Sequence, residues 1–126
     1  MGLSRHALRE IAMRCLYQHF LLKKDIKEAV YDNINGNEVD PFLYTVTIDA
    51  IKYEDDYIEM INNALRDDWT FERLGYVEQA ILIMAACELD MDIAPKAIVI
   101  NEAVTLAKKF CDDETYRLVN GVLDRL

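Results

Sequence analysis

The stretch GYVEQAILIMAACEL, residues 75–89, decides the fold that we predict for this chain. Its apolar residues recur at helical spacing, and Ile83 makes the face that they form broad. A helix that is apolar over most of its circumference must be enclosed by other elements. The sequence therefore predicts a central, nearly enclosed helix whose inward residues are Val77, Ala80, Ile81, Met84, Ala85 and Leu89.

Two further helices are predicted after this stretch. Pro95 is a favourable first residue for a helix over residues 95–110, with one apolar side formed by Ile98, Ile100, Ala103, Val104, Ala107 and Phe110. Asp112 and Asp113 begin the last helix. The pair Asn120-Gly121 is typical of a hairpin, but the apolar residues around it keep helical spacing. We predict an unbroken helix in which Gly121 allows a close backbone approach, at a cost of about 1 kcal/mol.

The first helix is predicted to begin after Ser4, a good N-cap residue. Its buried stripe is formed by Leu8, Ile11, Ala12, Cys15, Leu16 and Phe20. Arg5, His6 and Arg9 fall outside that stripe, near a helix N-terminus whose unpaired N–H groups attract anions.

The segment between these regions also reads as helix. A short helix over residues 25–34 ends at Asn35-Gly36-Asn37, and Asp40-Pro41 opens the next one, which breaks near residues 53–56. The acidic cluster after that break suits the first turn of a new helix better than a metal site, because the sequence places no histidine beside it. Trp69 is predicted to pin the connection over residues 67–70 to the core.

Composition agrees with one all-α domain. The chain has 126 residues, only two prolines and four glycines, and no long period-two run that would indicate a strand. We predict a single domain over residues 1–126, with helical subdomains of roughly residues 1–68 and 69–126.

Charge is distributed unevenly along the chain. The 14 basic and 23 acidic residues give a net charge of -9, which disfavours a nonspecific nucleic-acid coat. Residues 1–24 nevertheless carry five basic residues against one glutamate, a charge of +4, which leaves -13 for residues 25–126. Such asymmetry favours either a solvated helix face or a small phosphate-binding patch near the N-terminus.

Other function classes lose support from the sequence. It has no membrane-spanning apolar run and no signal peptide, and its three separated cysteines predict free thiols in a reducing cytoplasm. It also lacks zinc-ligand spacing, a glycine-rich phosphate loop and a nucleophile motif. We therefore expect no enzyme activity, no metal site and no cofactor.

Several segments together resemble the NusB family of transcription antitermination factors. These are SRHALRE (residues 4–10), the central stretch at 75–89, INEAV and LAKKF (100–110), and VNGVLD (119–124). The resemblance implies an all-helical fold of about seven helices in two packed subdomains. It also implies a cytoplasmic bacterial protein that binds boxA RNA, a single-stranded element, together with the ribosomal protein NusE. With RNA polymerase and other Nus factors, such a protein keeps transcription of ribosomal RNA operons processive.

The resemblance also assigns roles to individual residues. It implies RNA contacts at Ser4, Arg5, His6, Arg9, Arg14, Tyr17, Glu114 and Arg117, and a contact with the ribosomal protein at Glu78. The family's opening helix is usually richer in arginine than this one. In this sequence His6 and Ala7 stand where arginines are common. Asn101 and Glu102 are expected to be structural and to bond the neighbouring loop. The rival function is a protein–protein adaptor of the same fold that has lost RNA binding, and the broad face over residues 77–89 allows either a monomer or a homodimer.

Overall fold

The structure, a computed structural model, describes residues 2–66 and 68–126. Over these residues the chain is helical and contains no strand, which confirms the all-α class. In chain order the elements are α1 (Arg5–Leu22), α2 (Ile26–Ile34), α3 (Pro41–Tyr44), a π-helical segment (Thr45–Asp49), α4 (Ala50–Lys52), α5 (Glu54–Ala64), a 3-10 turn (Phe71–Arg73), α6 (Tyr76–Asp90), α7 (Lys96–Phe110) and α8 (Asp113–Asp124). Since α3, the π-helical segment and α4 run on without a break, these residues form seven helices.

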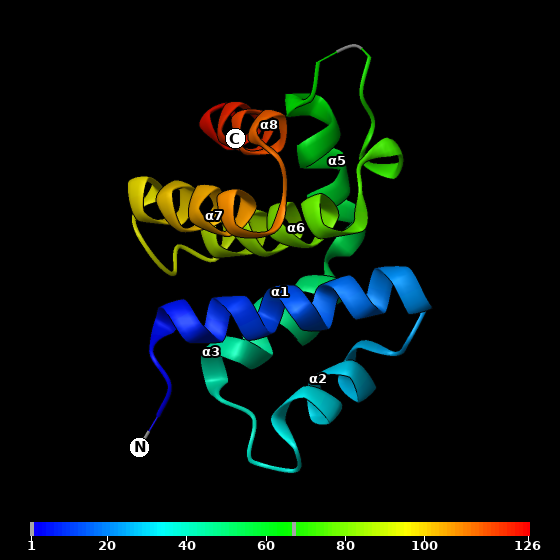
Figure 1. The fold of residues 1–126 in the computed structure, drawn as a ribbon, viewed down its shortest axis with the longest axis vertical. Coiled ribbons are helices and arrows are strands. Elements are labelled where there is room, and N and C mark those ends of the chain that lie inside the picture. Colours follow the sequence, from blue (N-terminus) through cyan, green and yellow to red (C-terminus); the bar gives the residue numbers. More distant parts are fainter. Residues whose placement is uncertain (1, 67) are drawn as a thin grey trace.

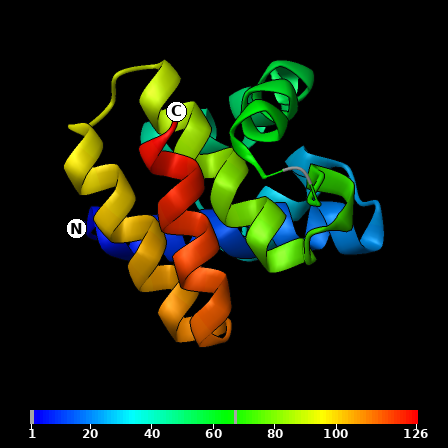
Figure 2. The ribbon, with the colours of Figure 1, turned by 90° about the horizontal axis from the view of Figure 1, so that it is seen from above.

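The central position of α6 is confirmed. Every residue from 79 to 88 is buried, and the helix packs against α1, α5, α7 and α8. Figure 1 shows α1 crossing the molecule between this group and the smaller group formed by α2 and α3. Seen from above, α7 and α8 lie side by side over the same end of the molecule (Figure 2). No helix among the described residues combines the length and apolar character that crossing a membrane requires.

The predicted helix boundaries hold where a side chain caps the helix. Ser4 Oγ accepts a hydrogen bond from Ala7 N at 3.1 Å, and Asp25, Asp40 and Asp112 cap α2, α3 and α8 in the same way. Asn35 and Gly36 both adopt positive φ values, which ends α2 at the predicted break. A turn at Tyr53 separates α4 from α5, as expected.

Two predictions about side-chain direction are wrong. Trp69 does not pin its connection to the core: its side chain is 42% exposed, while Phe71 and Leu74 are buried and hold that segment instead. Asp67, in the same connection, lies outside the described residues. On α7, Ile98 and Phe110 are exposed, because packing between α6 and α8 selects the neighbouring row of Val99, Ala103, Leu106 and Ala107.

Gly121 lies inside α8, so the helix prediction through Asn120-Gly121 is confirmed. The reason given for the glycine is wrong. A Cβ atom at Gly121 would meet only the Arg125 guanidinium, at 3.5 Å, and no backbone of another element.

Candidate nucleic-acid interface

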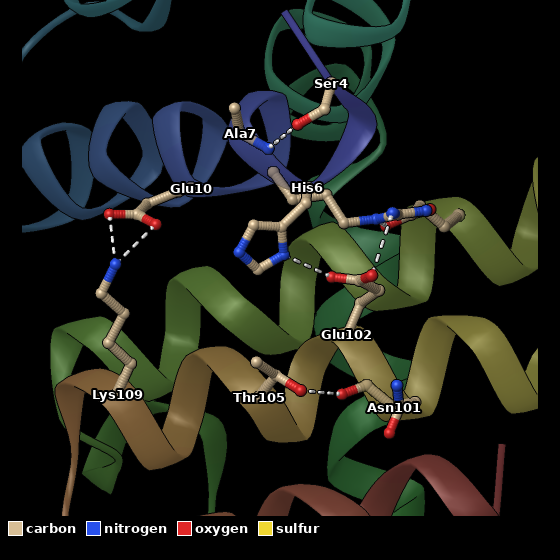
Figure 3. Close-up of polar contacts among 10 residues, drawn as sticks. Ser4, His6, Ala7, Glu10, Asn101, Glu102, Thr105 and Lys109 are labelled. Carbon is tan, nitrogen blue, oxygen red and sulfur yellow. Dashed lines mark hydrogen bonds and ion pairs between the residues drawn. The ribbon is translucent and has the colours of Figure 1, made fainter.

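A stripe of side chains runs along the side of α1 that faces α7. His6, Glu10, Arg14 and Tyr17 follow one another at intervals of four, four and three residues, which places them on one helix face. His6 Nδ1 donates to Glu102 Oε2 at 3.1 Å, and Lys109 Nζ donates to Glu10 Oε2 at 3.0 Å, as Figure 3 shows. Arg14 is exposed beyond these pairs. The structure thus brings His6, Arg14 and Tyr17 together, as the sequence predicts, and adds Lys109 from α7.

Tyr17 stands at the edge of this stripe and is partly buried. Its ring packs against the hydrophobic core, so the tyrosine contributes to packing as well as to the surface. Ser4, at the start of the helix, is exposed and its hydroxyl is engaged in the N-cap (Figure 3).

Arg9 does not lie on the solvent side of α1, so the predicted position is wrong. Its side chain is buried, and it forms a two-pronged ion pair with the buried Glu88 of α6: Nε to Oε2 at 3.0 Å and Nη2 to Oε1 at 2.7 Å. The hydrogen bond to Glu88 raises the pKa of Arg9 above its ordinary value. A phosphate would have to displace Glu88 from a dry site to reach this guanidinium, so Arg9 serves first to fasten α1 to α6.

Arg5 is exposed and is supported by an aromatic ring. Its guanidinium carbon lies 4.3 Å from the centroid of the Phe42 ring, which belongs to α3. A guanidinium in this position gains a cation–π attraction and keeps its N–H groups open to solvent. The side chain of Arg5 is thereby presented at the start of α1 with a restricted choice of orientations.

The predicted residues on α6 and α8 lie at a second corner. Glu78 Oε2 accepts from Gly75 N at 2.8 Å and completes the cap of α6, while Glu78 Oε1 accepts from Thr115 Oγ1 at 3.3 Å. Its carboxylate therefore ties α6 to the first turn of α8. Glu114 and Arg117 are both exposed on α8, and the Arg117 guanidinium lies 5.8 Å from the Tyr116 ring.

Sequence reasoning missed the cations at the C-terminal end of α7. Lys108 Nζ, on α7, lies 4.8 Å from the centroid of the Tyr116 ring, which belongs to α8 as Arg117 does. Lys109 Nζ bonds the carboxylate of Glu10 on α1. The signal was present as two adjacent lysines in the last turn of a predicted helix. Glu102 is structural, as expected, but it bonds His6 and lies 3.9 Å from Arg9 on α1, not on a neighbouring loop.

The three cysteines and the acidic start of α5 are the remaining candidate sites. Burial raises the pKa of Cys15 to about 11, that of Cys87 to about 12 and that of Cys111 to about 11, so all three thiols stay protonated at neutral pH. Among residues 2–66 and 68–126, no three His, Cys, Asp or Glu side chains gather as metal ligands would. The acidic start of α5 does have a histidine beside it, contrary to the prediction, since His19 Nε2 lies 3.7 Å from Glu54 Oε2.

Comparisons with known proteins agree on one family. The sequence profile of the NusB family matches residues 6–126. The transcription antitermination protein NusB of Exiguobacterium sp. is 38% identical over 98% of this chain and 97% of its own length, and that of Geobacillus kaustophilus is 34% identical over 98% and 95%. A solved structure of the antitermination factors NusB and NusE in complex with dsRNA superimposes with a TM-score of 0.81 at 26% identity, covering 95% of this chain and 92% of that one. The chain belongs to the NusB family.

Proposed function

We propose that this chain is a transcription antitermination factor that binds boxA-type RNA together with the ribosomal protein NusE. With RNA polymerase and other Nus factors, it would keep transcription of ribosomal RNA operons processive. The observation that carries this proposal is the match in sequence and fold, over nearly the whole chain, to proteins that are named for antitermination. The chain would act in the bacterial cytoplasm by binding, without catalysis or a cofactor.

The RNA surface of this proposal begins on α1 and continues to α8. Arg5 and Arg14 supply exposed cations for phosphates, and His6 and Tyr17 supply rings beside them. Single-stranded RNA is commonly held by this combination of cationic contacts and aromatic stacking. Arg117 and Glu114 extend the surface, while Ser4 and Arg9 support it by capping α1 and fixing it to α6.

Glu78 lies at the proposed contact with the ribosomal protein. Residues 25–126 carry a net charge of -13, and complementary potential speeds the encounter with a basic ribosomal protein. Because Glu78 already bonds Gly75 and Thr115, it would present to that partner a carboxylate whose orientation is fixed.

The RNA surface is tested by removing its two exposed arginines. We expect Arg5→Gln with Arg14→Gln to weaken binding of labelled boxA RNA in the presence of NusE. The slope of log K against log salt should fall in magnitude by about 1.4, or about 0.7 for each phosphate that the variant no longer neutralises. Lys27→Gln with Lys52→Gln, which removes two exposed lysines from α2 and α4, is the matched control for net charge. Equal affinity losses in both double variants would show that only the average charge matters.

One observation favours the adaptor as a second candidate. Arg9, His6 and Lys109 all have carboxylate partners within the protein. The surface therefore offers fewer unpaired cations than the number of basic residues in this region. If the chain binds NusE but not RNA, alone or in the complex, the adaptor function replaces the one proposed.

A further inference from the structure

A groove lies between α8 and the end of α5, away from the stripe on α1. It has a volume of about 260 Å³ and an apolar floor formed by Leu65, Leu118 and Val122. Figure 1 shows the C-terminal end of α5 beside α8. This volume is below the ~300 Å³ of the smallest usual small-molecule pockets, so an open groove of this size suits one unit of an extended chain.

The rim of the groove is cationic. Arg66 follows α5, Arg117 lies on α8, and Arg125 follows the end of α8. The Arg125 guanidinium lies against Gly121, since a Cβ atom there would be 3.5 Å from its nearer Nη atom, and Arg125 Nε donates to Ala64 O at 2.6 Å, which leaves its Nη groups for a ligand. Among the residues that the structure describes, none that lines the groove is acidic, although the chain as a whole carries a charge of -9. The local charge therefore favours an anionic ligand.

An exposed aromatic ring completes the groove. Trp69 lines it with a side chain that is 42% exposed, and Arg73 lies over the indole with its guanidinium carbon 5.4 Å from the ring centroid. Tryptophan is enriched at binding interfaces, where one end of the side chain is apolar and the other is in contact with water. An indole between guanidiniums offers stacking for a nucleobase and ionic contacts for the adjoining phosphates.

We propose that this groove binds one nucleotide of a single-stranded RNA, with the base against Trp69 and the phosphates between Arg66, Arg117 and Arg125. The inference rests on the proposed function, because Arg117 belongs to both surfaces and makes the groove a continuation of the RNA path along α8. An acidic peptide would satisfy the arginines but would leave the indole face without a flat partner. The observations therefore favour RNA.

Trp69 is the only tryptophan of the chain, so its fluorescence reports on the groove directly. The probes are a fluorescein-labelled boxA RNA of about twelve nucleotides, within the range of single-strand site sizes, an oligouridine of the same length and a polyglutamate peptide. Each is titrated in the presence of NusE with correction for the partner's own emission. We expect boxA RNA to quench Trp69 with the same midpoint as the change in RNA anisotropy. Trp69→Leu should weaken RNA binding about fivefold or more, and Trp69→Phe should weaken it less, since a smaller ring still stacks.

Arg66→Gln tests the rim without touching the residues of the proposed function. It should reduce the salt slope by about 0.7, while Lys27→Gln on α2, at the far end of the molecule in Figure 1, leaves the slope unchanged. Circular dichroism and the melting temperature establish that each variant is folded.

Three outcomes would overturn the inference. If RNA binds with constant Trp69 fluorescence and wild-type affinity in Trp69→Leu and Arg66→Gln, the groove is not on the RNA path and the proposed function stands. If polyglutamate quenches Trp69 at lower concentration than either RNA, the groove is an acidic-peptide site. If no RNA binds in any mixture, the proposed function fails with it.

Discussion

Arg9 lies within two turns of an exposed helix start, yet its guanidinium is enclosed by α6. Periodicity placed it outside the apolar stripe because arginine is counted as a solvent residue in such patterns. Its burial depends on Glu88, which is 79 positions away in sequence and only 1% exposed. A pair of this kind is set by tertiary structure, which is why local sequence reasoning could not find it.

The first prediction concerns this ion pair. Arg9→Ala leaves the carboxylate of Glu88 buried without its partner, and breaking a buried pair from one side costs about 3–5 kcal/mol. Arg5→Ala removes an exposed cation that rests on Phe42, so the expected loss is no more than about 1 kcal/mol. Urea unfolding of both variants measures the difference.

A double variant, Arg9→Met with Glu88→Leu, serves as the control. It removes both charges and should recover part of the lost stability. A free energy of unfolding for Arg9→Ala within about 1 kcal/mol of the wild type would contradict the assignment.

His19 supplies a second prediction at this scale. Its Nδ1–H donates to Lys24 O at 2.7 Å, so a proton on Nε2, facing Glu54, makes the ring cationic. The contact with Glu54 raises the pKa of His19 above its ordinary value of 6.5. A raised folded-state pKa contributes stability that is fully present below the unfolded value and is lost as pH rises through the folded value.

Melting temperatures of the wild type and Glu54→Gln, measured about one pH unit below and two units above the ordinary histidine pKa, test this contribution. We expect the variant to lose more stability at the lower pH than at the higher one. The helix-terminus effect of Glu54 is the same at both pH values, so it cancels in the comparison. An equal loss at both pH values would show that the His19 contact is not an ion pair.

At the scale of helices, the sequence predicts a helix boundary best where a capping side chain or a residue with positive φ marks it. Ser4, Asp25, Asp40 and Asp112 all cap helices, and Asn35 ends one with a positive φ. The π-helical turn over residues 45–49 was not predicted, because a local widening leaves the apolar spacing nearly unchanged. The direction of Trp69 was also missed, since a connection has no periodicity from which to infer a buried side.

Gly121 provides the prediction for α8. An alanine Cβ at this position meets only the end of a flexible arginine side chain, in ordinary contact. Gly121→Ala should therefore stabilise the protein by about 0.5–1 kcal/mol through helix propensity and a less flexible unfolded chain. A lower melting temperature than the wild type would reveal a close approach that the structure does not contain.

At the scale of the whole molecule, charge counted along the sequence differs from charge on the surface. Residues 1–24 sum to +4, but two of their five basic residues have carboxylate partners: Arg9 pairs with Glu88 and Lys24 with Asp32. Arg5 and Arg14 are both exposed on α1, and the sequence could propose them together because one helix carries both. The arginines around Trp69 come from α8 and from the segment after α5, so only the fold gathers them.

The proposed division into two subdomains stays a prediction. Helix α5 belongs to the predicted first subdomain, because it precedes the boundary near residue 68, but it packs against α6 and α8 of the second. The α1–α6 contact, which Arg9 and Glu88 reinforce, joins the two halves across the centre of the molecule.

Binding of labelled boxA RNA, with and without NusE, at two salt concentrations tests the central claim most directly. We expect tighter binding with the partner and a fall of log K against log salt with a slope of roughly -2 to -3, which corresponds to about three to four phosphate contacts on a single strand. A stable complex with NusE that leaves the RNA unbound at both salt concentrations would contradict it.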